Sequence, residues 1–165
     1  FGADPLSDLF PGLLNPADTI ALRKQTGDRI VVTEPMESFY LWDALVHGGQ
    51  CLFGTAEYAM FGNKRGTLVK CMELANAGKF DQALPLYREL DPIRDLMNDV
   101  FVWNIVRKNQ YSLAPIKYWY ELLGMPMGPC RPPLEPFADA QMKQTIRDGL
   151  LKHGVIDAVP AAAAA

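Results

Sequence analysis

The sequence predicts an α/β fold that begins with two short parallel strands and continues as helices. Residues 30–33 and 51–53 are apolar segments of strand-like composition, and the residues between them have a helical pattern. A helical connection implies that the two strands run parallel, and a sheet of only two strands is marginal in water. We therefore expect the last part of a larger α/β barrel, with the remaining barrel strands supplied by sequence outside this chain.

Composition and charge limit the classes of function. The 165 residues are 49% apolar and 21% charged, which is ordinary for a globular domain with its own core. A net charge of -3 with scattered basic residues does not indicate a nucleic-acid partner. No run of about 18 apolar residues is present, so no membrane-spanning helix is expected. The three cysteines lack CxxC spacing, which argues against disulfides and a zinc site and favours a cytoplasmic location.

Helix boundaries are predicted from capping residues and from the positions of glycine and proline. Pro16 begins the first helix, Arg23 lies in its last turn, where the helix dipole favours a cation, and Gly27 ends it. Pro92 is expected to kink a long helix. The predicted helices cover residues 16–26, 36–47, 64–77, a stretch from the cap Asp81 to 108, 116–123, and a stretch from the cap Asp139 to 153.

Three regions are expected along the chain. Residues 1–62 would form the C-terminal part of the barrel, residues 63–156 the final barrel helix and a C-terminal helical extension, and residues 157–165 a tail. Between positions 125 and 136 the chain holds five prolines, which predict an extended connector. Helix follows helix after residue 63, so the extension is expected to pack as a helical appendage.

Five segments, taken in order, resemble the motifs of a known family. The segments are TGDRI at 26–30, LFGTA at 52–56, AGKFDQA at 77–83, PIK at 115–117 with LG at 123–124, and RPPLEP at 131–136. No single one of them is specific, but in this order they resemble the C-terminal half of the dihydrodipicolinate synthase and N-acetylneuraminate lyase family, whose members are pyruvate-dependent class I aldolases. The resemblance covers roughly residues 16–156.

The resemblance implies a fold and a chemistry. The fold would be a (β/α)8 TIM barrel, with strands seven and eight at residues 30–33 and 51–53, followed by the helical extension. The protein would be a lyase in which a lysine forms a Schiff base with pyruvate or another 2-oxo acid, and a tyrosine from an earlier strand moves protons. Aldol condensation, aldol cleavage and dehydration all remain open. The family needs no metal or organic cofactor and usually forms a homotetramer, so a tetramer or dimer is expected.

The Schiff-base lysine of the family has no match in this chain. The residues that should hold it, 8–12, read Asp-Leu-Phe-Pro-Gly, and the first lysine is Lys24, in the last turn of a predicted helix. We therefore expect the catalytic lysine outside this chain, and the chain alone is expected to be inactive. The alternative is a non-catalytic relative of the family, or a helical interaction module.

Candidate substrate-binding residues lie where the two predicted strands end, because the active sites of such barrels form at the C-terminal ends of strands. Glu34 could act on the Schiff base electrostatically or orient a substrate hydroxyl, but it could also be a solvated residue at a helix start. Gly54 would let the strand approach a ligand or would simply form a bend. Phe53 fits barrel packing better than a wall of the ligand site. The two histidines lack HExxH spacing and give no metal site. The candidates are Thr33, Glu34, Phe53, Gly54 and Thr55.

Overall fold

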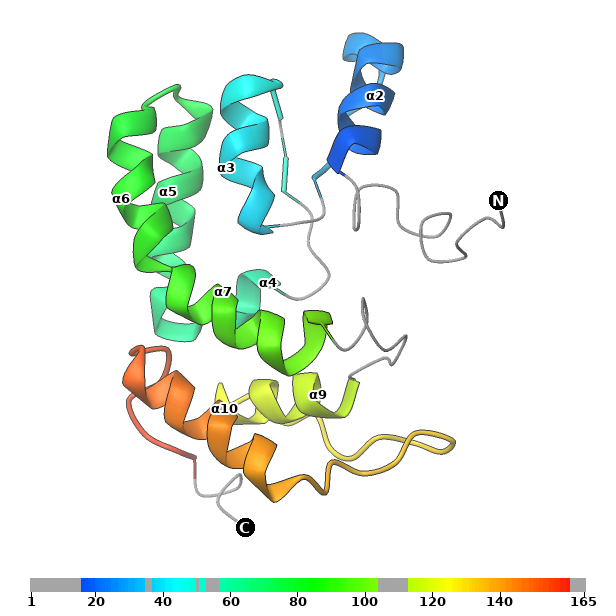
Figure 1. Cartoon of the computed structure of the whole chain (residues 1–165), viewed down its shortest axis with the longest axis vertical. Helices are drawn as coiled ribbons and strands as arrows, with labels where there is room; N and C mark the ends of the chain where they lie inside the picture. The colour runs from blue at the N-terminus through cyan, green and yellow to red at the C-terminus, as the bar shows by residue number, and fades with distance from the viewer. Residues whose placement is uncertain (1–15, 35–36, 50, 53–56, 104–112, 161–165) are drawn as a thin grey trace. The chain divides into compact units, whose positions relative to one another are not determined.

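The computed structural model describes residues 16–34, 37–49, 51–52, 57–103 and 113–160 (Figure 1). Within these ranges the regular secondary structure is helical, and residues 123–139 form a long connector between the last two helices. It divides into two compact units. The first unit contains residues 1–58 and 67–88, and the second contains residues 59–66 and 89–165.

The two predicted strands do not form in the described residues. The two segments meet in a single parallel β-bridge between Glu34 and Leu52, in which the Glu34 N–H donates to the carbonyl oxygen of Cys51 at 2.9 Å. The prediction of an α/β fold with strands seven and eight of a (β/α)8 barrel is therefore wrong for this part of the chain. The physical reason is the lack of partners, because a parallel strand needs neighbours on its edges and cover on both faces. Ile30 and Val31 remain 55% and 61% exposed.

The first unit is organised around three helices that lie side by side (Figure 1). Leu41 of α3, Leu74 of α5 and Ala83 of α6 are buried in one apolar cluster. Tyr40 is also buried, and its hydroxyl donates to the amide oxygen of Asn76 at 2.7 Å, which links α3 to α5. The helices of this unit are α2 (Pro16–Thr26), η1 (Gly27–Arg29), α3 (Glu37–Val46), α5 (Arg65–Asn76, whose first two residues belong to the second unit) and α6 (Phe80–Glu89, whose last residue belongs to the second unit).

The helix predicted from Asp81 to residue 108, with a kink at Pro92, forms as separate helices in the described residues, which end here at 103. Leu90 stands between α6 and the next helix, and Pro92 lies in the first turn of that helix. A proline is tolerated in a first turn, where its missing N–H would have no intrahelical partner, whereas it disrupts a helix interior. The two helices that directly follow α6 are α7 (Asp91–Met97) and the π-helix η3 (Asn98–Val102).

The second unit packs around Trp119, which is fully buried. Its indole N–H donates to the carbonyl oxygen of Met60 at 3.0 Å. Gly149 allows α10 to approach α7, since a Cβ at this position would lie 2.5 Å from Leu96 Cδ2. The predicted cap is confirmed, because the Asp139 carboxylate accepts from the backbone N–H of Met142 at 2.9 Å. The other helices here are α4 (Glu57–Met60, shared with the first unit), η2 (Gly62–Lys64), α9 (Leu113–Leu122) and α10 (Ala140–Lys152).

Two buried tyrosines allow a matched test of hydrogen bonding. Tyr40→Phe should lower the free energy of unfolding by about 1–2 kcal/mol, because it leaves the Asn76 amide oxygen without its donor. Tyr118→Phe should change it by less than about 0.5 kcal/mol or raise it, because the buried Tyr118 hydroxyl has no hydrogen-bond partner among the described residues. Urea unfolding followed by circular dichroism measures both variants. If both variants lost the same stability, the hydrogen bond from Tyr40 to Asn76 would not be the stabilising contact that we describe.

The environment of Tyr40 also predicts that the free energy of unfolding depends on pH. Burial is the largest influence on this phenol and raises its pKa above the usual 10.0, although the hydrogen bond to Asn76 opposes the shift. A raised pKa in the folded state means that folding favours the neutral phenol. Its contribution to stability is therefore present below about pH 10 and is lost as the pH rises through the folded-state pKa. The stability difference between the parent chain and Tyr40→Phe should shrink above about pH 10 in unfolding experiments.

Candidate functional site

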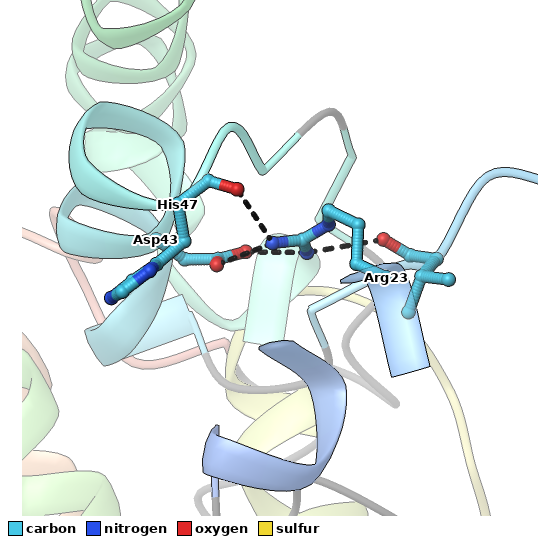
Figure 2. Close-up of polar contacts among 4 residues, drawn as sticks. Arg23, Asp43 and His47 are labelled. Atoms are coloured by element: carbon cyan, nitrogen blue, oxygen red, sulfur yellow. Dashed lines mark hydrogen bonds and ion pairs between the residues drawn. The ribbon is translucent and has the colours of Figure 1, made fainter. Parts of the chain in front are cut away.

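A buried ion pair lies beside the predicted site in the first unit (Figure 2). Arg23 extends from the last turn of α2, and Asp43 lies on α3. Two parallel contacts join them, from Arg23 Nη1 to Asp43 Oδ1 at 2.7 Å and from Arg23 Nη2 to Asp43 Oδ2 at 2.8 Å. The two side chains are only 13% and 0% exposed. This is the bidentate arrangement in which a guanidinium holds a carboxylate most strongly.

The same guanidinium also binds two backbone carbonyls. Arg23 Nη1 donates to the carbonyl oxygen of His47, and Nη2 donates to that of Val32, both at 3.3 Å (Figure 2). Arg23 therefore connects α2, α3, the turn after α3 and the extended segment that leads to Glu34. These contacts fix the backbone two residues before the buried carboxylate of Glu34.

The turn after α3 is shaped to accommodate the Asp43 carboxylate. Gly48 has a φ of 68°, a left-handed conformation that glycine adopts without steric cost. The Gly49 N–H donates to the carbonyl oxygen of Asp43 at 3.0 Å. A Cβ on Gly49 would lie 2.3 Å from Asp43 Oδ2, so only glycine leaves room for the carboxylate at this position.

The charges of this region stabilise the guanidinium. The hydrogen bond to Asp43 is the largest influence on Arg23 and raises its pKa; burial opposes this effect, and the charges of Asp43 and Glu34 add to it. Arg23 is therefore a permanent cation. The Glu34 carboxylate is near enough to contribute to its electrostatic environment.

The structure describes two of the five predicted substrate-binding residues. Thr33 is exposed, whereas Glu34 is 0% exposed. The interpretation of Glu34 as a solvated residue at a helix start is therefore wrong. Its bridge to Leu52 places Glu34 beside the segment that leads to the remaining candidates. Those candidates, Phe53, Gly54 and Thr55, lie outside the described residues.

The ion pair does not follow from the sequence pattern. The helix dipole alone accounts for Arg23 in that pattern, although the principal partner of Arg23 is a carboxylate on another helix. A signal was available, because Asp43 stands between Trp42 and Ala44 in an otherwise apolar helix. An acidic residue in such a stretch is rarely buried unless it is paired. The identity of the partner, 20 positions away, could not be read from local sequence pattern.

The geometry makes Arg23 a positioning group, not a ligand-binding one. Its four terminal N–H donors are directed at Asp43 and at two carbonyls, and its Nε is buried with no hydrogen-bond partner among the described residues. Over the same part of the chain, no group of three or more His, Cys, Asp or Glu residues is arranged to hold a metal ion. None of the described helices is both long and apolar enough to cross a membrane.

Comparison with known proteins shows which fold this chain resembles. No protein-family model matches it, and no match is found among curated protein sequences. Among solved structures, a dihydrodipicolinate synthase from Thermotoga maritima matches 88% of this chain with a TM-score of 0.61 and 18% sequence identity. A second dihydrodipicolinate synthase structure matches 86% of the chain with a TM-score of 0.59 and 19% identity.

The resemblance stated from the sequence is thus confirmed as a likeness of fold. The chain spans 43–44% of the length of the two synthases, which is consistent with the C-terminal half of such a protein. At these identities the likeness concerns the fold alone. A similar chain path does not require strand hydrogen bonds, since a parallel ladder forms only where neighbouring strands are present.

Removing the Asp43 carboxylate tests the role of the ion pair. Asp43→Asn should lower the free energy of unfolding by about 2–4 kcal/mol, because it leaves the largely buried Arg23 cation without its counter-charge. The backbone amide of Glu34 should also exchange its hydrogen faster, since Arg23 anchors the segment that carries it. Urea unfolding and amide hydrogen exchange measure the two effects.

The control is the exposed pair between Lys70 and Glu73, whose side chains are both 61% exposed. Glu73→Gln makes the same change from acid to amide in the same unit, and it should alter stability by less than about 0.5 kcal/mol. If Asp43→Asn cost no more than this control, the ion pair would not be the constraint that we describe.

Proposed function

We propose that this chain is part of a lyase that forms a Schiff base with pyruvate or another 2-oxo acid, by aldol condensation, aldol cleavage or dehydration. The supporting observation is the likeness of 86–88% of the chain to dihydrodipicolinate synthase structures. In this proposal the catalytic lysine lies in sequence outside the chain. The complete protein would be a cytoplasmic homo-oligomer, a tetramer or a dimer.

The chemistry requires an amine that attacks the ketone of the 2-oxo acid, so that a carbon–nitrogen bond forms and water leaves. Lys24 is exposed in the last turn of α2 and does not lie at the end of a strand, where the active sites of such barrels form. The proposal therefore assigns the amine to another part of the protein. This chain would supply the substrate-binding side, with Glu34 as the central residue.

Glu34 suits this role because it combines full burial with a held backbone. Its N–H is bonded to the Cys51 carbonyl, and the carbonyl of Val32 is bonded by Arg23. A carboxylate fixed in this way would stabilise the positive charge of an iminium or accept a hydrogen bond from a substrate hydroxyl. Thr33, Phe53, Gly54 and Thr55 are proposed to complete the substrate-binding surface.

A second candidate function is a helical interaction module without catalytic activity. It is favoured by the apolar side chains that the first unit leaves exposed. They include Ile30 at 55%, Val31 at 61%, Trp42 at 44% and Val46 at 58%. Large exposed apolar side chains of this kind mark contact surfaces when they are contiguous.

Reductive trapping distinguishes the two candidates. The product of the complete reading frame is incubated with pyruvate and sodium borohydride, and its intact mass is measured. We expect the mass of one reduced pyruvate adduct, because borohydride converts a lysine Schiff base into a stable secondary amine. The 165-residue chain treated identically should gain no adduct.

Peptide mapping of the adduct then locates the lysine. A modified lysine outside the 165 residues supports the proposal. Glu34→Gln in the complete protein should reduce the yield of adduct, with Glu73→Gln as the control that leaves it unchanged. The lyase proposal fails if neither protein gains an adduct, and the interaction module then becomes the better hypothesis.

A further inference from the structure

The second unit contains a cavity of about 290 Å³ that the proposed lyase chemistry does not use. This volume is close to the lower limit of ordinary small-molecule sites. Side chains of α9 and α10 line the cavity together with the connector between them. The residues that matter for its chemistry are Lys117, Tyr118, Glu121, Pro129, Phe137 and Lys143.

Two aromatic rings and an ammonium form one part of the lining. The rings of Tyr118 and Phe137 lie with centroids 5.6 Å apart and planes inclined by 58°. The Lys143 Nζ lies 5.4 Å from the centroid of Tyr118 and 5.9 Å from that of Phe137. Cation–π attraction holds the ammonium at this position. A ligand that binds this ammonium would therefore not pay the entropic cost of ordering a free lysine side chain.

A second ammonium is held by the connector. Lys117 Nζ donates to the carbonyl oxygen of Pro129 at 2.8 Å. An ammonium has three donors, so two remain for a ligand. Within the described part of the chain, neither Lys117 nor Lys143 forms an ion pair with a carboxylate. Both cations are thus available to an anion in the cavity.

The balance of charge indicates which kind of anion fits. Two lysines and Glu121 give the lining a formal charge of +1, from two positive charges and one negative charge. A monoanion matches this charge, whereas a dianion such as phosphate exceeds it and is repelled more strongly by Glu121. The aromatic lining favours a ligand that carries a flat apolar group beside its charge.

We propose that this cavity binds a small aromatic carboxylate. The carboxylate would lie between Lys117 and Lys143, and the ring would rest against Tyr118 and Phe137. This inference does not depend on the proposed lyase function, because it uses residues of the second unit only and none of the predicted substrate-binding residues.

Benzoate is the probe, and the 165-residue chain is titrated with it by calorimetry and by NMR. Benzamide, which has the same shape without the charge, should bind at least about tenfold more weakly. Lys117→Gln and Lys143→Gln should each weaken benzoate binding by about fivefold or more. Glu121→Gln should strengthen it, since the variant removes a repelling charge.

The matched control is Lys152→Gln, which removes an exposed charge from the same helix α10 outside the cavity lining and should leave benzoate binding unchanged. The proposal is overturned if the unaltered chain does not bind benzoate, or if benzamide binds equally well. It is also overturned if inorganic phosphate competes as strongly as benzoate, which would indicate an unselective cationic surface. The opposite signs expected for Glu121→Gln and the two lysine variants separate a binding role from a loss of folding.

Discussion

The buried pair of Arg23 and Asp43 is the constraint on which the first unit depends. Two charges removed from water are tolerated only when hydrogen bonds satisfy them. The structure meets this requirement with a bidentate contact and two backbone carbonyls, and it needs a glycine at position 49 to leave the carboxylate room. The pair thereby fixes which segments are neighbours. Its main effect is to specify this arrangement, and its net contribution to the free energy of unfolding is smaller.

The position of Glu34 follows from this constraint. Arg23 holds the carbonyl of Val32, and the chain then continues into the bridge with Leu52. A fully buried carboxylate is costly unless it is paired with an opposite charge or hydrogen-bonded. The Arg23 cation offsets part of that cost, as its electrostatic interaction with Glu34 indicates. The ion pair and the proposed substrate-binding residue are thus two parts of one polar arrangement.

The helices could be predicted from sequence to the extent that their signals are local. The predicted span 16–26 is the observed α2, and Asp139 caps α10 as expected, because a cap and a stop lie within a few residues of the helix they define. The strand prediction failed for the opposite reason. The apolar pattern at Ile30 and Val31 is suited to a strand, but a strand also needs partners, and pattern alone does not supply them. The link between Arg23 and Asp43 is likewise non-local.

The same difference indicates which elements of the described chain carry its likeness of fold to the synthase structures. Helical hydrogen bonds close within one segment, so a helix keeps its form whatever lies beside it. The hydrogen bonds of a parallel ladder form only between segments. In the described residues, the bridge contains one such bond, from the Glu34 N–H to the Cys51 carbonyl oxygen. The likeness of chain path is therefore carried chiefly by helices. The segment from Ile30 to Glu34 is held by a side chain, because Arg23 donates a hydrogen bond to the carbonyl oxygen of Val32.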